Sequence, residues 1–92
     1  MYYVYILKSL KDSRLYIGRS SQLKKRLVEH NQGRVTSTTH RRPWKLVYYE
    51  GYRNEDDAKD RERGLKKSGS VYMGLIKRIA RSLTIEDTFG RP

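Results

Sequence analysis

The stretch YYVYILKSLKDSRLYIG, residues 2–18, decides the fold, because two short runs in it alternate between aliphatic side chains and tyrosines. Alternation with period two places successive side chains on opposite faces of a β-strand, so the runs 2–7 and 14–18 predict two strands. The turn-prone pair Asp12-Ser13 lies between them. The stretch therefore predicts a β-hairpin at the start of the chain.

Period two also assigns the side chains of the hairpin to its two faces. One face carries the aliphatic residues Val4, Ile6, Leu15 and Ile17. Tyr5 and Tyr16 then share the other face. A buried phenol hydroxyl needs a hydrogen-bond partner, which makes tyrosine a demanding core residue. Two interpretations follow: the phenols do chemistry, or they cover the sheet as half-buried amphipathic residues.

A helix, a loop and a third strand are predicted next. Ser20 or Ser21 can cap a helix that ends near Asn31. Residues 32–43 are polar and basic without an apolar period, which predicts a loop. The run WKLVYYE, residues 44–50, is rich in aromatic and β-branched residues and predicts a strand.

Two further helices are predicted after this strand. Asn54 is a helix cap, and the three acids that follow it suit the positive end of a helix dipole. Gly69-Ser70 separates this helix from the next, which Ser70 can cap. An apolar stripe with a four-residue repeat follows: Val71, Leu75, Ile79 and Leu83. The order β-β-α-β-α-α predicts an α+β fold, a small three-stranded sheet flanked by helices. Residues 1–83 are predicted to form one domain and residues 84–92 a flexible C-terminal tail.

The composition excludes several classes of protein. A chain of 92 residues is the size of one domain. The absence of cysteine excludes disulfides and thiolate metal sites. No apolar run approaches the roughly 20 residues that a membrane span needs, and no signal-like segment begins the chain. We therefore expect a cytoplasmic protein that does not contact a membrane.

The net charge of +11 indicates a polyanionic partner. Residues 1–50 carry 11 Lys and Arg against 3 Asp and Glu, whereas residues 51–92 carry 10 against 7. The excess is therefore concentrated in the N-terminal half, as expected of a local binding surface. Nucleic acid is the commonest partner of such a surface. The alternatives at this point are a basic domain that is merely soluble, or one that binds RNA without chemistry.

The motifs and their spacing resemble those of the GIY-YIG nuclease superfamily, in particular its small single-domain bacterial members. Tyr3-Val4-Tyr5 stands in place of Gly-Ile-Tyr, and Tyr16-Ile17-Gly18 follows about ten residues later. Four further features match in order: Arg26, His30 with the following Asn-Gln-Gly, the sequence Arg42-Pro43-Trp44, and Glu62. The similarity covers residues 2 to about 67. The superfamily's larger enzymes add separate DNA-recognition domains, of which this sequence shows none.

The resemblance implies a metal-dependent endonuclease that hydrolyses DNA phosphodiester bonds by a one-metal mechanism. Glu62 matches the metal-binding glutamate, and carboxylate oxygen suits Mg²⁺, with Mn²⁺ as a substitute. Tyr16 is implied to activate or orient the attacking water and Tyr5 to assist through a hydrogen bond. The planar fork of Arg26 can hold the scissile phosphate. With an unperturbed pKa of about 6.5, His30 can pass a proton near neutral pH.

Other basic residues are expected to contact the nucleic-acid backbone without reading sequence. They are Arg19, Lys24, Lys25, Arg34, His40, Arg41, Arg42, Lys66 and Lys67. Gly18 has a structural role, since it allows a tight path from strand to helix. DNA in branched, damaged or nicked form is the expected partner, with RNA less favoured, and the oligomeric state is open. The alternative function is a non-catalytic or weakly catalytic module that binds nucleic acid through its basic face.

Overall fold

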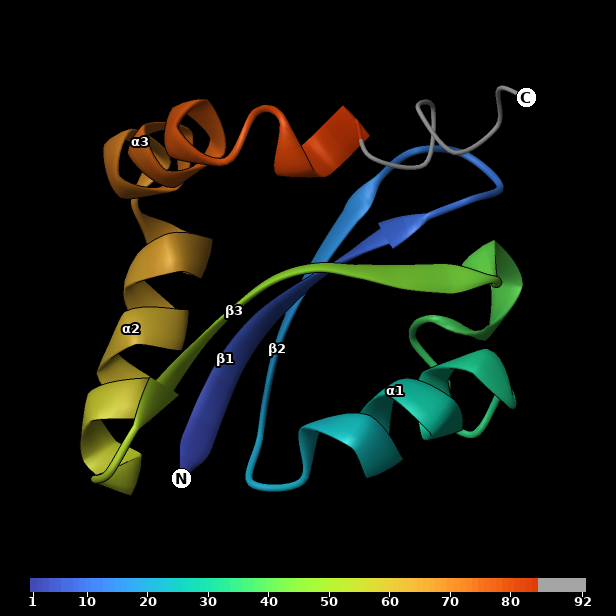
Figure 1. The fold of residues 1–92 in the computed structure, drawn as a ribbon, viewed down its shortest axis with the longest axis horizontal. Coiled ribbons are helices and arrows are strands. Elements are labelled where there is room, and N and C mark those ends of the chain that lie inside the picture. Colours follow the sequence, from blue (N-terminus) through green and yellow to red (C-terminus); the bar gives the residue numbers. More distant parts are fainter. Residues whose placement is uncertain (85–92) are drawn as a thin grey trace.

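Three antiparallel strands form the sheet at the centre of the fold (Figure 1). The structure is a computed structural model that describes residues 1–84. β1 (Tyr2–Ser9) lies between β2 (Leu15–Ser20) and β3 (Trp44–Tyr52). Because β1 is the central strand, β2 and β3 are both edge strands.

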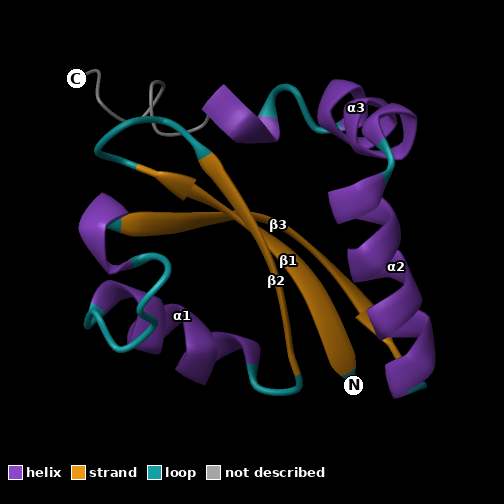
Figure 2. Cartoon of the chain, turned by 180° about the vertical axis from the view of Figure 1, so that it is seen from behind, coloured by secondary structure: helices purple, strands orange, loops and turns teal. Residues whose placement is uncertain are grey.

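Helices cover both faces of this sheet (Figure 2). α1 (Leu23–Asn31) packs on one face, and α2 (Glu55–Lys67) and α3 (Gly69–Arg78) pack on the other. Two short 3₁₀ helices, Thr39–Arg41 and Ser82–Thr84, complete the described part of the chain. The predicted α+β fold with β-β-α-β-α-α order is confirmed, and the predicted loop 32–43 contains the first of these short helices.

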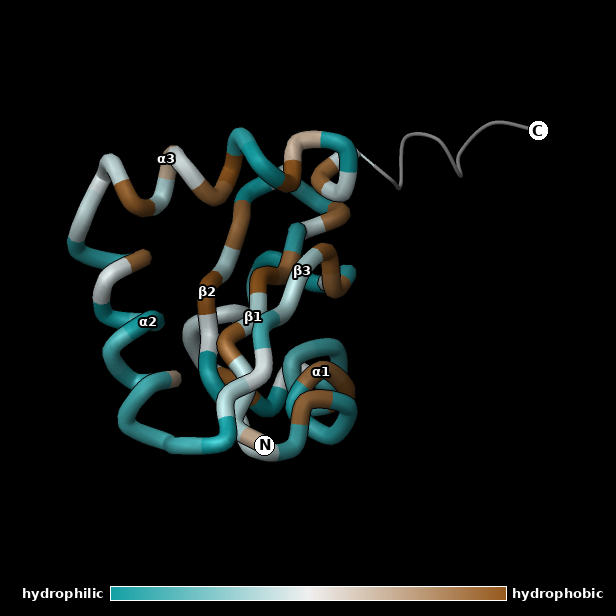
Figure 3. Tube along the Cα trace, turned by 60° about the vertical axis from the view of Figure 1, so that its left-hand side comes forward, coloured by the Kyte–Doolittle hydropathy of each residue, from teal (hydrophilic) through white to brown (hydrophobic). Residues whose placement is uncertain are grey.

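β1 carries side chains into two separate hydrophobic cores, one on each face. Val4 and Ile6 pack among residues of α2 and α3. Tyr5 and Leu7 pack on the opposite side with Trp44. Figure 3 shows the strands between α2 on one side and α1 on the other. Two cores on a single three-stranded sheet explain how so short a chain buries enough apolar surface to fold.

The hairpin has the register that the alternation requires. Tyr5 lies opposite Gly18, and Leu7 lies opposite Tyr16. Tyr5 and Tyr16 thus share the α1 face, as predicted. The tyrosine face is not open, however: α1 covers it, and Tyr5 is only 1% exposed.

The helix starts agree only in part with the predicted caps. Asn54 caps α2, accepting a hydrogen bond from the Asp56 backbone at 2.8 Å. α1 has no side-chain cap, because Ser20 instead accepts a bond from the backbone of Gln22, at 3.0 Å, before the helix begins. The predicted Ser70 cap of α3 is also wrong. Ser68 both ends α2 and caps α3, so Ser70 lies within the helix.

The predicted stripe on the last helix is partly wrong as well. Leu75 and Ile79 are buried and Leu83 packs against them, but Val71 is 39% exposed. Because α3 begins at Gly69, Val71 falls in its first turn, where the helix is only beginning to approach the sheet. The stripe therefore starts one turn later than the sequence suggests.

A half-buried carboxylate fixes α2 on the sheet. Glu50 of β3 accepts hydrogen bonds from Tyr48, Tyr52 and the guanidinium of Arg61 on α2, which forms an ion pair with it at 2.9 Å. Burial acts to raise the pKa of Glu50, but the hydrogen bonds from Arg61 and the two phenols outweigh it and lower the pKa. This anchor sets the position of the residue that follows Arg61, which is Glu62.

The described part of the chain ends at Thr84. Of the predicted tail 84–92, Thr84 ends the short helix Ser82–Thr84, and residues 85–92 lie outside the described residues. Within residues 1–84, no helix is both long and apolar enough to cross a membrane.

Candidate active site

The two phenols of the hairpin meet above Gly18. The ring centroids of Tyr5 and Tyr16 are 6.4 Å apart. A Cβ atom on Gly18 would lie 2.4 Å from the hydroxyl oxygen of Tyr5 and 2.9 Å from the ring of Tyr16. Glycine is thus required here for close approach of the rings, which gives the predicted structural role of Gly18 a specific cause.

Gly18→Ala is expected to destabilise the fold by roughly 1–3 kcal/mol, because Tyr5 is buried and cannot retreat without disturbing its neighbours. The melting temperature should fall by roughly 5–20 °C. Gly74→Ala is the matched control: no atom lies within 4 Å of its added Cβ, and alanine favours the interior of α3. Equal melting temperatures for the two variants would show that Gly18 is not tightly packed.

A directed chain of hydrogen bonds holds Tyr5. Its hydroxyl lies 2.8 Å from Nε2 of His30, and Nδ1 of His30 lies 2.8 Å from Oγ1 of Thr38. The Thr38 hydroxyl donates to the carbonyl of Val35, which can only accept. Nδ1 of His30 therefore carries its proton and donates to Thr38, and Nε2 accepts from Tyr5. Thr38 is a member of the site that the sequence analysis missed.

Burial keeps His30 neutral at pH 7. His30 is fully buried, and desolvation together with the nearby Arg26 charge lowers its pKa to about 4. The expectation of an imidazole that titrates near neutral pH is therefore wrong for this environment. Burial and the neighbouring Tyr16 raise the pKa of Tyr5 to about 12, against the effect of Arg26, so Tyr5 also keeps its proton.

The burial of His30 predicts an acid-sensitive fold. The unfolded chain takes up this proton near pH 6.5, whereas the folded chain does so near pH 4. Between these values the unfolded state binds more protons, so the free energy of unfolding should fall by about 3 kcal/mol as the pH drops from 6.5 to 4. Urea denaturation across this range measures the fall. In a His40→Gln variant, which leaves one imidazole for NMR titration, a midpoint near 6.5 would contradict the buried Tyr5–His30 bond.

The hydroxyl of Tyr16 is placed differently from that of Tyr5. Tyr16 is half-buried, and its ring packs against His30 and Trp44 at centroid distances of 5.0 and 6.1 Å. Within residues 1–84, nothing forms a hydrogen bond with its hydroxyl. Of the two phenols, only Tyr16 therefore has an oxygen available to a water or a ligand.

Arg26 lies at the rim of this cluster on α1. Its guanidinium is 3.3 Å from the Glu29 carboxylate, and its side chain is 38% exposed. It lies close enough to Tyr5 to oppose the rise of that phenol's pKa. His30 and Arg26 are one helical turn apart, as predicted, but one faces the core and the other faces solvent.

Glu62 reaches the hairpin from the opposite side of the sheet. Its carboxylate accepts from Arg19 of β2 at 3.2 Å and from Lys66 at 3.0 Å, and its side chain is 19% exposed. Its charge contributes to the raised pKa of Tyr5. Of the other predicted catalytic residues, Tyr16, Arg26 and Glu62 thus all act on the pKa of Tyr5, and His30 is hydrogen-bonded to it. Two of the five residues come from β-strands, two from α1 and one from α2.

The carboxylate of Glu62 suits a Mg²⁺ ion that keeps most of its waters, and within the described part of the chain it does not form part of a metal site built only from protein ligands. No group of three or more acidic, histidine or cysteine side chains that could hold a metal occurs among residues 1–84. Mg²⁺ commonly uses one or two carboxylates and retains several waters. A single, partly exposed carboxylate at the edge of the site meets that requirement.

Comparisons with known proteins identify the family of this chain. The model of the GIY-YIG catalytic domain matches residues 1–74, a range that includes all five residues. The chain belongs to the GIY-YIG family. The chain is 47% identical over 68 residues to a UPF0213 protein of Clostridium perfringens, covering 73% of this chain and 72% of the relative. It is 39% identical over 66 residues to a UPF0213 protein of Staphylococcus saprophyticus, covering 71% and 79%. No solved structure matches the chain.

Basic side chains surround Glu62 in this GIY-YIG domain. Arg19 lines two shallow pockets, one with Lys25 and Arg26 of α1, the other with Glu62 and residues of α2. The second pocket is lined by Lys59, Arg63, Lys66 and Lys67. Lys59 and Arg63 were missed by the sequence analysis. Lys59 lies three residues before Glu62, a spacing that puts the two side chains beside each other on a helix, whereas no such spacing indicates Arg63.

Four of the predicted DNA-binding residues lie elsewhere in the GIY-YIG domain. Arg34, His40, Arg41 and Arg42 belong to the loop after α1, and none of them lines the two pockets around Arg19. Arg41 pairs with Asp12 at 3.0 Å and lies over the ring of Trp44. The guanidinium of Arg42 donates to the carbonyl of Thr39. Arg41 and Arg42 therefore also hold this loop, which carries Thr38, in place.

Proposed function

We propose that this GIY-YIG protein is a metal-dependent endonuclease that hydrolyses phosphodiester bonds in DNA. The observation that carries the proposal is that the two ion-pair partners of the Glu62 carboxylate border the other candidate groups: Lys66 lines one pocket with Tyr16, whose hydroxyl is free, and Arg19 lines another with Arg26. A module that only binds nucleic acid gains nothing from a carboxylate among its cations, since it repels phosphate. In hydrolysis the carboxylate can hold a divalent cation and the phenol can orient the attacking water.

The basic groups position the phosphate. Arg26 is exposed at the rim of the site, and its planar guanidinium can hold two phosphate oxygens at once. Arg19 stands between the two pockets and already binds anionic groups, namely Glu62 and Glu55. These cations also stabilise the extra negative charge that develops on phosphorus during hydrolysis.

The hydrogen-bond pattern divides the work between the two phenols. The Tyr16 hydroxyl is free to orient the attacking water, and once it has lost its own proton the phenolate can accept a proton from that water. Tyr5 keeps its proton and donates a hydrogen bond to His30, so it acts by holding the geometry of the site. His30 and Thr38 in turn fix Tyr5. His30 is then a positioning residue rather than a proton carrier.

Glu62 is the residue that would hold Mg²⁺, with Mn²⁺ as a substitute. When bound, a divalent cation supplies charge neutralisation for the phosphate and lowers the pKa of water. Arg19 and Lys66 already occupy both carboxylate oxygens, so Glu62 must exchange at least one of these partners. Lys66 is the more exposed of the two and the easier to displace.

A nuclease assay tests the proposal. The protein should cut supercoiled plasmid and branched oligonucleotide duplexes with Mg²⁺ or Mn²⁺, and EDTA should stop the cutting. The second candidate function, a binding module, is favoured by the complete ion-pairing of Glu62. Folded protein that binds the same DNA but leaves it intact with either metal would establish that function instead.

A further inference from the structure

A groove on the α1 face of the sheet lies next to the proposed site. α1 has nine residues and covers only part of this face. The uncovered part, beside edge strand β3, forms a groove of about 620 Å³ between α1 and the sheet. Tyr3 and Tyr49 form its aromatic wall, Leu27 and Leu46 its floor, and Lys24 lines its rim.

The groove exposes an aromatic ring without an evident folding role. Tyr49 is 55% exposed, and Tyr3 packs edge-on against it with centroids 5.8 Å apart. Within residues 1–84, no hydrogen bond to the hydroxyl of either ring occurs. The ring of Tyr49 is held at a fixed angle by Tyr3 and leaves its own surface accessible. Such a ring can stack on a planar group.

The groove is continuous with the surface around Arg19. Lys25, Gln22 and Ser21 line both the groove and the pocket that contains Arg19 and Arg26. The path from the candidate catalytic groups into the groove is therefore lined by cations and hydrogen-bonding side chains. A chain of phosphates that leaves the site along α1 meets Lys25 first and Lys24 next.

We propose that this groove binds an unpaired nucleic-acid segment, with a base stacked on Tyr49 and phosphates beside Lys24 and Lys25. Aromatic platforms interleaved with cations are the common means of binding single strands, because every base offers a π-face to stack. The inference rests on the proposed function and specifies its substrate class: nucleic acid with a single-stranded segment adjoining the cleaved bond. A blunt duplex would leave the groove empty.

The test measures binding in EDTA, so that no cleavage intervenes. The probes are fluorescein-labelled oligonucleotides: a 15-residue oligo(dT), the matching oligo(rU), and duplexes with and without a dT branch. Tyr49→Ala should weaken oligo(dT) binding on the order of 5- to 100-fold, the range expected for one stacked base. Tyr49→Phe keeps the ring and should bind within about twofold of the wild type. The two homopolymers show whether the unpaired strand is DNA or RNA.

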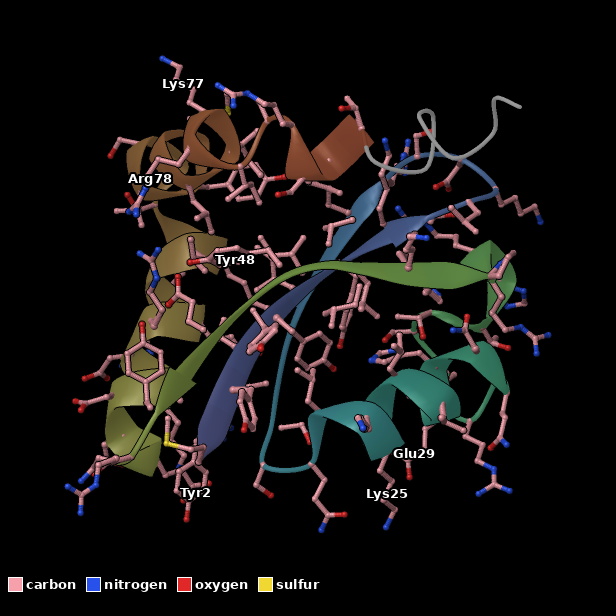
Figure 4. The ribbon with its side chains drawn as sticks, viewed as in Figure 1. Tyr2, Lys25, Glu29, Tyr48, Lys77 and Arg78 are labelled. Carbon is pink, nitrogen blue, oxygen red and sulfur yellow. The ribbon has the colours of Figure 1, made fainter. Side chains whose placement is uncertain are left out.

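Matched controls separate stacking from general effects. Tyr72→Ala removes a half-buried tyrosine on α3, on the other face of the sheet, and should not change binding. Lys24→Ala should reduce affinity and the salt dependence of binding, whereas Lys77→Ala should not. Figure 4 shows Lys77 on α3, at the far end of the molecule from Lys25 on α1. Thermal melts confirm that the variants are folded.

Three results would overturn the inference. They are equal binding of branched and blunt duplexes, unchanged oligonucleotide affinity in Tyr49→Ala, and concentration-dependent self-association that Tyr49→Ala abolishes, which would assign the groove to a second copy of the chain. Failure here is distinguishable from failure of the proposed function. If the protein cuts DNA with metal but Tyr49→Ala leaves oligonucleotide affinity unchanged, only the groove assignment fails. If binding depends on Tyr49 but no cutting occurs, the nuclease assignment fails.

Discussion

Glu62→Gln is expected to reduce metal-dependent cleavage on the order of 100-fold or more, the scale of losing a metal's charge stabilisation. Binding of DNA should stay unchanged or become slightly tighter. The amide keeps the size of the side chain but is a poor ligand for Mg²⁺. It also removes one negative charge beside Arg19 and Lys66, which then interact more strongly with phosphate.

Glu55→Gln is the matched control for Glu62. Glu55 also pairs with Arg19, at 3.4 Å, but its side chain is 48% exposed, against 19% for Glu62. This variant should cut at close to the wild-type rate. The measurements are plasmid nicking at fixed Mg²⁺ and fluorescence anisotropy in EDTA. Parallel losses of cutting and binding in Glu62→Gln, or equal defects in both variants, would count against a metal role.

Tyr16→Phe and Tyr5→Phe are expected to fail in different ways. Tyr16→Phe should lower the single-turnover cleavage rate on the order of 100-fold, as for loss of a group that handles the proton of the attacking water. Its melting temperature should not change, because that hydroxyl bonds to nothing within residues 1–84. Tyr5→Phe strips the donor from a buried imidazole nitrogen and should destabilise the fold by about 1–3 kcal/mol.

Cleavage rates and thermal melts of both variants, measured together, test this division. The test depends on which variant loses cleavage and which loses stability, more than on the size of either loss. A stable Tyr5→Phe variant with no activity, beside an active Tyr16→Phe variant, would reverse the assignment. The same result would place Tyr5 next to the water.

Local pattern was enough to predict the hairpin and the faces of its side chains. Period two requires no knowledge of distant residues, so Tyr5 and Tyr16 could be placed together from the sequence alone. The convergence of Arg26 and Glu62 on them came from the resemblance, since α1 and α2 lie on opposite faces of the sheet and no local rule joins them. In the structure, Tyr16, Arg26 and Glu62 each act on the pKa of Tyr5.

The burial of His30 could not be read from the sequence. A histidine near a helix end is ordinarily solvated, and its environment here depends on Thr38, which the following loop returns to the helix. The groove beside Tyr49 was hidden for a similar reason, because it exists only where a short α1 stops covering the sheet. The displaced cap at Ser68 shows the limit of a local rule: a glycine marked the break, but the helix begins on it.

The salt bridges around Glu62 have a consequence for the order of events at this surface. In the absence of a divalent ion, two side-chain cations already mask the carboxylate, so that an incoming polyanion meets an almost uniformly attractive field. For the proposed nuclease, we therefore expect binding of nucleic acid and its cleavage to be separable steps. A nuclease of this kind can bind nucleic acid without cleaving it, and cleavage then starts when the divalent ion binds.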